Sequence, residues 1–152
     1  MIKTILVGIG GTKFTDVAIN RAIELATLHG AFLTGVTVVD LKRLQHIGSV
    51  PLGAGAYAEK LRKMRTEITE ERIEEALAKF EKKCNEANIT FKVKRETGDP
   101  FELMISYARY SDVIIFGLRS LFDYGFTPEP QDTLMRLVSQ GVRPIIAVSP
   151  EY

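Results

Sequence analysis

Cysteine, histidine and tryptophan are scarce in this chain of 152 residues, which contains one, two and none of them respectively. The single cysteine, Cys84, excludes an intrachain disulfide, and with His29 and His46 far apart in the sequence there is no zinc-binding cluster. Cys84 lies on an apolar helical face, and free cysteine is among the most buried residue types. We therefore expect a core thiol and no metal site.

A charge excess and a long apolar run are also missing. The 20 basic residues balance 19 acidic ones, for a net charge of +1, and nucleic-acid binding depends on clustered Lys and Arg. No apolar run approaches the length of a membrane span. The first strand begins so close to Met1 that no room is left for a secretion signal. These absences predict a cytoplasmic protein without nucleic-acid or membrane partners.

Motifs of common nucleotide-using enzymes are absent or incomplete. The Gly-Lys-Ser/Thr phosphate loop of many NTPases does not occur. Gly8 to Lys13 partly matches a dinucleotide-binding fingerprint, but Lys13 replaces the third glycine and would hinder helix–strand packing; a tight turn without a ligand is the alternative. Ser120 and Asp132 could approach each other in space, but no nucleophile has an obvious base beside it. Enzymatic activity has little support, and no catalytic residue is assigned.

The chain does contain a regular alternation of strand and helix patterns within the length of one domain, residues 1–152. Short apolar runs alternate with helical stripes, and Ile89, Phe91 and Val93 alternate with polar residues as in a strand at a sheet edge. The predicted strands are 3–9, 32–39, 89–93, 112–117 and 143–148, and the predicted helices are 16–29, from 69 onward, from 100 onward and 131–140. This pattern predicts an α/β fold with an open parallel sheet.

Two helix boundaries carry clear local signals. Asp99 and Glu102 form a capping box around Pro100 at the first helical position, so a helix begins there. Gly30 follows the helix of 16–29, where a residue in the left-handed conformation is expected.

The stretch from Asp40 to Tyr57 is the longest segment predicted to be irregular. Gly53 to Tyr57 suits either a glycine-hinged lid that brings Tyr57 over a ligand or a plain linker. A basic cluster follows and opposes the charge gradient of the helix from 69 onward, which predicts a separate helical piece. The cluster forms either a solvated face or a site for an anion or a partner. Its members are Lys60, Arg62, Lys63 and Arg65.

Open parallel sheets bind ligands beyond the carboxyl ends of their strands, at the point where the strand order reverses. If the first strand lies beside the fourth, that crevice is lined by residues 8–12, 38–40 and 117–120. This crevice is the predicted ligand site.

The order and spacing of these segments resemble the universal stress protein family over nearly the whole chain. The resemblance rests on Ile5 to Thr12, Val36 to Val39, Gly98 to Pro100, Asp112 to Gly117 and Arg143 to Val148. It implies a Rossmann-like three-layer sandwich, with an open five-stranded parallel sheet of order 3-2-1-4-5 and helices on both faces. It also implies a stress-response role and homodimers that pair through the last strand, 143–148. Many members of the family bind ATP and others do not.

The resemblance further shows where this chain departs from members that bind ATP. Those members usually carry Asp near the end of the first strand, where this chain has Gly10. Gly117 matches the first glycine of the family's phosphate loop, but Ser120 replaces the second, and Asp132-Thr133 is nearest to the final Gly-Ser/Thr pair. Ser120 lacks the conformational freedom of glycine, and Asp132 would cap the helix N-terminus and repel an anion. We therefore do not expect ATP to bind in the usual family manner; binding through a modified loop is the alternative.

We accordingly expect a small protein that acts through ligand binding or protein interaction. Val38 matches a family position that contacts adenine, although apolar strand ends pack in the core by default. Arg119 could pair with an anionic ligand, or with Asp40 or Asp132. The candidate ligand-binding residues are Gly10, Gly11, Thr12, Val38, Asp40, Gly117, Arg119, Ser120 and Thr133. Three aromatic residues follow the predicted fourth strand: Phe122, Tyr124 and Phe126. We expect their side chains to pack against the protein's own core and not against a ligand.

Overall fold

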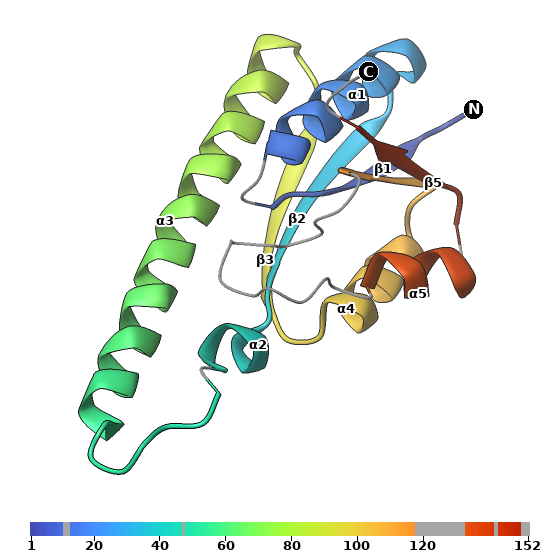
Figure 1. The fold of residues 1–152 in the computed structure, drawn as a ribbon. Coiled ribbons are helices and arrows are strands. Elements are labelled where there is room, and N and C mark those ends of the chain that lie inside the picture. Colours follow the sequence, from blue (N-terminus) through green and yellow to red (C-terminus); the bar gives the residue numbers. More distant parts are fainter. Residues whose placement is uncertain (11–12, 47, 118–132, 142, 150–152) are drawn as a thin grey trace.

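Figure 1 shows the fold in a computed structural model, which describes residues 1–10, 13–46, 48–117, 133–141 and 143–149. Five parallel strands form one sheet of order β3-β2-β1-β4-β5. The strands are β1 (Thr4–Gly8), β2 (Phe32–Val39), β3 (Phe91–Thr97), β4 (Val113–Gly117) and β5 (Ile145–Val148). The expected fold class and strand order are confirmed.

Helices cover both faces of this sheet. They are α1 (Lys13–His29), α2 (Leu41–Gln45), α3 (Gly55–Glu86), α4 (Pro100–Ala108) and α5 (Thr133–Ser139). α1 and α3 lie on one face, and α4 and α5 pack together on the other. Right-handed crossovers between parallel strands produce this three-layer arrangement. Within the described ranges, no helix is both long enough and apolar enough to cross a membrane.

Part of the core forms where α3 reaches the sheet. A Cβ atom on Gly35 of β2 would lie 2.6 Å from Ile9 Cδ1 and 2.7 Å from Phe80 Cε1, so the absence of a side chain permits this close approach. Phe80 is fully buried and meets Phe91 edge-to-face, with ring centroids 5.6 Å apart. Cys84, one turn further along α3, is also fully buried, as expected. Burial, with a smaller contribution from Glu81, raises the pKa of the Cys84 thiol to about 11.

The two helix boundaries that were predicted from local signals, the start of α4 and the end of α1, are confirmed. Asp99 Oδ1 accepts a hydrogen bond from the Glu102 backbone N–H at 3.0 Å, and Pro100 opens α4. Gly30 has φ +65° just beyond α1. β3 lies at a sheet edge, as its alternation predicts, but begins at Phe91 and continues to Thr97, past the predicted end.

The prediction that the basic cluster belongs to a separate helical piece is wrong, because α3 runs unbroken from Gly55 to Glu86. Lys and Arg are good helix formers, and an unfavourable macrodipole position costs only about 0.3–1 kcal/mol. Two of these cations also have local partners. Arg62 Nε donates to the Gln45 carbonyl and Arg65 Nη1 donates to the His46 carbonyl, both at 3.2 Å. They therefore sit at the C-terminal end of α2, where positive charge is favoured.

The predicted irregular stretch after β2 is likewise shorter than expected. α2 lies inside it, and residues 55–57 already form the first turn of α3. α2 begins at Leu41 because Asp40 acts as its N-cap and accepts a hydrogen bond from the Arg43 backbone N–H at 3.2 Å. This short-range capping contact was not recognised in the sequence.

Candidate functional site

The predicted crevice lies at the carboxyl ends of β1, β2 and β4. β1 pairs with β2 on one side, with Gly8 level with Val36, and with β4 on the other, with Val7 level with Ile115. The pairing with β2 continues through a 2.8 Å hydrogen bond from the Ile9 N–H to the Val36 carbonyl. Strand order reverses between β1 and β4, which is where open parallel sheets bind ligands.

Two polar groups of this crevice are used within the protein. The Gly10 N–H donates to Thr15 Oγ1 at 3.1 Å, and Thr15 is buried in the first turn of α1. The half-buried carboxylate of Asp40 caps α2. A backbone amide and a carboxylate that a ligand could have contacted therefore already have partners.

Gly117, at the end of β4, is required by packing. A Cβ atom there would lie 2.8 Å from the carbonyl oxygen of Phe14, on the first turn of α1. Backbone atoms cannot yield as a flexible side chain can, so any other residue at position 117 would push α1 away from the sheet. The close packing of α1 on β4 thus explains this glycine without a ligand.

The remaining candidate residues divide into two groups. The Val38 side chain is fully buried on β2, and Thr133 opens α5. The other candidates lie outside the described residues: Gly11, Thr12, Arg119 and Ser120. Asp132 and the aromatic residues Phe122, Tyr124 and Phe126 lie outside them as well.

Tyr57 does not cover the crevice. It lies in the first turn of α3 with 69% of its surface exposed. In Figure 1 the start of α3 lies beyond α2, well away from the carboxyl end of β1. Residues 53 and 54 thus lie just before α3, and residues 55–57 form its first turn.

No group of three His, Cys, Asp or Glu side chains that could hold a metal ion occurs among the residues placed in the structure.

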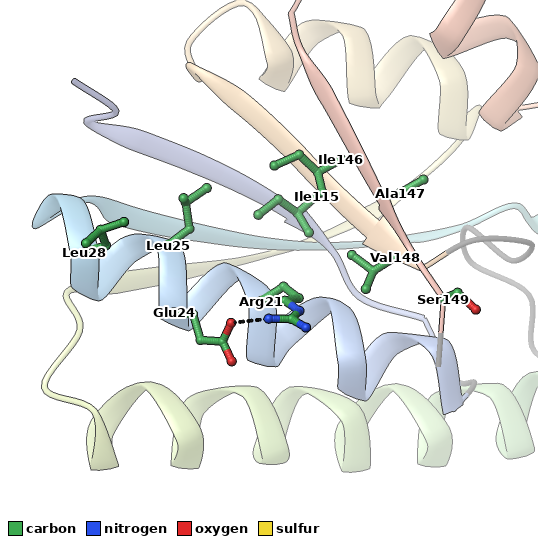
Figure 2. Close-up of a pocket in the computed structure, with 9 residues that line it drawn as sticks. All are labelled: Arg21, Glu24, Leu25, Leu28, Ile115, Ile146, Ala147, Val148 and Ser149. Atoms are coloured by element: carbon green, nitrogen blue, oxygen red, sulfur yellow. Dashed lines mark hydrogen bonds and ion pairs between the residues drawn. The ribbon is translucent and has the colours of Figure 1, made fainter. Parts of the chain in front are cut away.

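An apolar groove that was not predicted from the sequence lies between α1 and β5 (Figure 2). It has a volume of about 500 Å³. Arg21 and Glu24 form a 2.7 Å ion pair in it, on α1. The lining residues are Arg21, Glu24, Leu25, Leu28, Ile115, Ile146, Ala147, Val148 and Ser149.

This groove borders a sheet edge. β5 pairs with β4 on one side and is the last strand of the sheet on the other. Ile146 is 41% exposed and Ala147 is exposed as well. Among the described residues no strand pairs with the outer side of β5. Its backbone therefore offers hydrogen-bonding groups to another strand, and its exposed side chains offer apolar area.

Comparisons with known proteins agree with this architecture. The family model described as Universal stress protein family matches residues 1–120. No curated protein matches the chain in sequence.

Solved structures extend the likeness to nearly the whole chain. Universal stress protein UspA from Lactobacillus plantarum is 17% identical, with 97% of each chain covered and a TM-score of 0.68. A universal stress protein in complex with cAMP is 15% identical, with 97% of each chain covered and a TM-score of 0.60. A universal stress protein family protein from Arabidopsis thaliana with AMP bound is 14% identical, covers 97% of this chain and 91% of its own, and has a TM-score of 0.57. At these identities the structures establish a common fold.

Proposed function

The chain belongs to the universal stress protein family, and we propose that it acts in a stress response, in the cytoplasm, by binding and not by catalysis. The binding unit in this proposal is a homodimer paired through β5. The unpaired edge strand with its exposed Ile146 is the observation that carries it. Two copies related by a two-fold axis would continue the sheet across this edge and bury its apolar surface.

The adjoining groove supports the same proposal. It begins at β5 and is lined mostly by aliphatic side chains of α1, β4 and β5. Pairing through β5 would place two such grooves on either side of the two-fold axis. A wider apolar surface would result, which suits a protein partner or an apolar ligand.

The test is the oligomeric state of an Ile146→Lys variant, measured by light scattering after gel filtration at micromolar concentration. We expect the wild type to be dimeric and the variant monomeric, because the lysine places a charge in the paired edge. Leu41→Lys is the matched control, since Leu41 is 39% exposed, on α2, away from β5. A wild-type protein that is monomeric, or a variant that remains dimeric through β5, would contradict the proposal.

Binding of an adenine nucleotide in the crevice is the second candidate function. It is favoured by the two relatives solved with cAMP and with AMP, ligands with a single phosphate. The internal partners of the Gly10 N–H and the Asp40 carboxylate support the view that ATP is not held in the usual family manner. A nucleotide with one phosphate needs fewer backbone donors than a triphosphate does.

Calorimetric titration tests this second function, with cAMP, AMP and ATP–magnesium as separate ligands. Mass spectrometry of molecules released on denaturation should come first, so that a co-purified nucleotide is not missed. We expect AMP or cAMP to bind more tightly than ATP. Gly10→Asp is the informative variant, because it restores the acidic residue that ATP-binding members usually carry. If ATP binds most tightly to the wild type, the modified loop forms a triphosphate site and the proposed preference is wrong.

A further inference from the structure

Two large apolar side chains of α5 are exposed. Met135 is 69% exposed and Val138 is 60% exposed, and at a spacing of three residues they are neighbours on the helix surface. α5 connects β4 to β5, and a crossover helix packs back over the strands that it joins. These side chains therefore lie near the edge of the sheet that β5 forms. We call Met135 and Val138 the α5 patch.

A contact with α4 shows which way the α5 patch faces. The Arg136 guanidinium carbon lies 4.0 Å from the centre of the Phe101 ring of α4, so Arg136 marks the side of α5 that faces α4. Leu137, the next residue, is fully buried. At about 100° per residue, Val138 lies about 200° from Arg136, on the opposite side of α5. Because α4 packs on β2, further from β5, Val138 faces the open edge of the sheet.

The spacing of strands and helices indicates what would cover this side of α5. In the β5 dimer proposed above, the two β5 strands are antiparallel and the two-fold axis is perpendicular to the sheet, so both α5 helices lie on the same face. If each α5 is centred over β4 and β5, their axes are two strand spacings apart, which is about 10 Å. Packed helices have interaxial distances of about 8–10 Å. A second copy thus places its α5 at packing distance, with the Val138 sides facing each other.

The other face of the same edge differs. There α1 packs mainly on β4 and β1, one strand further from the edge than α5. In the same dimer the two α1 helices would be four strand spacings apart, which is about 19 Å and too far for direct packing. The α1–β5 groove therefore stays open on each side of the two-fold axis. Only the face that carries α5 brings two helices together.

We propose that the α5 patch packs against α5 of a second copy, with Val138 and Met135 of the two copies in contact across the two-fold axis. This inference rests on the proposed β5 dimer and adds a second layer of contacts to it. The pair of α5 helices covers one face of the joined β5 strands. The surface left for an apolar ligand or a protein partner is then the α1 face, with its two grooves.

Cysteine cross-linking tests the α5 contact separately from the β5 dimer. Val138→Cys, Ile146→Cys and Leu28→Cys are each treated with a short bifunctional maleimide, and covalent dimers are measured on a denaturing gel. We expect dimers from the first two variants. Leu28→Cys is the control and should give none, because Leu28 is 77% exposed but lies on α1. The wild type shows whether the buried Cys84 reacts.

The pattern of cross-links distinguishes the two proposals. Cross-linking of both Ile146→Cys and Val138→Cys supports the α5 contact. Cross-linking of Ile146→Cys without Val138→Cys leaves the β5 dimer standing and overturns the α5 contact. Cross-linking of Val138→Cys alone would mean that the copies meet without pairing their sheets, which overturns both. Without a covalent dimer of either variant, the β5 dimer fails and this inference fails with it.

Opposite charges at position 138 provide a second test. Val138→Lys and Val138→Glu each place like charges across the axis, so each should dimerise at least about tenfold more weakly than the wild type. The two variants mixed together should form heterodimers, because each contact then joins opposite charges. Light scattering after gel filtration measures this, circular dichroism confirms that the helices are retained, and Leu41→Lys is the control. If both variants dimerise as the wild type does, the α5 contact is overturned.

Discussion

The two edges of the sheet differ in chemistry and in how they are held. β3 has charged residues along most of its length, at Lys92, Lys94, Arg95 and Glu96. It is also tied to a helix on each face, because Arg95 pairs with Glu74 of α3 and Glu96 accepts a hydrogen bond from the Tyr107 hydroxyl of α4. β5 has only the four residues Ile145–Val148, all apolar, with Ile146 exposed.

Natural sheets use charged side chains to discourage edge-to-edge pairing. β3 follows that rule and β5 does not. The comparison supports the proposal that β5 is the edge that pairs with a second chain. It distinguishes β3, whose charged side chains contact α3 and α4, from β5, which leaves apolar surface exposed. The predictions below test this division, beginning with the largest expected effect.

Removal of the core beneath β3 should cost the most. Phe80 is fully buried against Phe91, so Phe80→Ala is expected to lower the free energy of unfolding by about 3–5 kcal/mol. Ile146→Ala on β5 should cost less than about 1 kcal/mol in the monomer, because a partly exposed side chain loses little burial. Denaturant unfolding at low protein concentration measures both. Equal losses would mean that β5 contributes as much to the fold as β3 does.

The second-largest effect on stability is expected at Asp112, whose side chain connects the start of β4 to the start of β1. Asp112 Oδ2 accepts hydrogen bonds from the backbone N–H groups of Lys3 at 2.7 Å and Thr4 at 3.0 Å. These bonds hold the pKa of Asp112 below its ordinary value, with smaller contributions from the Thr4 hydroxyl and Arg143. A lowered pKa stabilises the fold above the ordinary value of about 3.9, and this contribution is lost as the pH falls through the folded-state pKa.

Asp112→Asn should therefore be less stable at neutral pH and should show a flatter decline of stability in acid. Denaturant unfolding measured between neutral pH and pH 3 follows both changes. An unchanged acid profile in Asp112→Asn would show that other carboxylates dominate acid unfolding.

A smaller effect on stability is expected at the hydrogen bond from Tyr107 of α4 to Glu96 of β3. Burial, followed by the hydrogen bond to Glu96, raises the pKa of Tyr107 to about 12. The neutral hydroxyl is thus favoured in the folded state, so its contribution is complete below the ordinary tyrosine value of about 10 and is lost as the pH rises toward the folded-state value.

Tyr107→Phe should lower the free energy of unfolding by about 1 kcal/mol at neutral pH through loss of the hydrogen bond. In a spectroscopic titration of tyrosinate, a late transition near pH 12 should disappear in this variant. Persistence of the late transition would assign it to another tyrosine.

The smallest effect is expected for the ion pair between Arg95 and Glu74. Both side chains are about half exposed, at 49% and 62%, and exposed pairs contribute about 0.2–1 kcal/mol. A double-mutant cycle with Arg95→Gln and Glu74→Gln should give a coupling energy in this range that decreases as salt is added. A larger coupling that resists salt would mean that the β3 edge is held more tightly than its exposure suggests.

Sequence patterns predicted the parts of the fold that depend on neighbouring residues. The capping box of Asp99 and the edge position of β3 could be read because each needs only a few adjacent side chains. The strand order came from the resemblance to a family. The unbroken α3 could not be read from local charge alone, because Arg62 and Arg65 donate hydrogen bonds to carbonyls at the end of α2, which are distant in sequence.

The ligand crevice stays a prediction, because the structure describes only some of its residues. Its location followed from parallel strands ending at one edge, and Gly10, Val38 and Gly117 lie at those strand ends. The use of the Asp40 carboxylate as a helix cap could have been inferred from its position just before a helical pattern, had the short α2 been recognised. The α1–β5 groove could not be read, because its residues come from three segments whose proximity exists only in the folded chain.

Gly117 has a consequence for how such chains diverge. Its lack of a side chain is demanded by Phe14, whose carbonyl oxygen would lie 2.8 Å from any added Cβ. Selection for a stable fold would therefore preserve this glycine in a descendant that had lost its ancestral ligand. A glycine retained at this strand end therefore records the closeness of a helix to a sheet and is no evidence of a ligand.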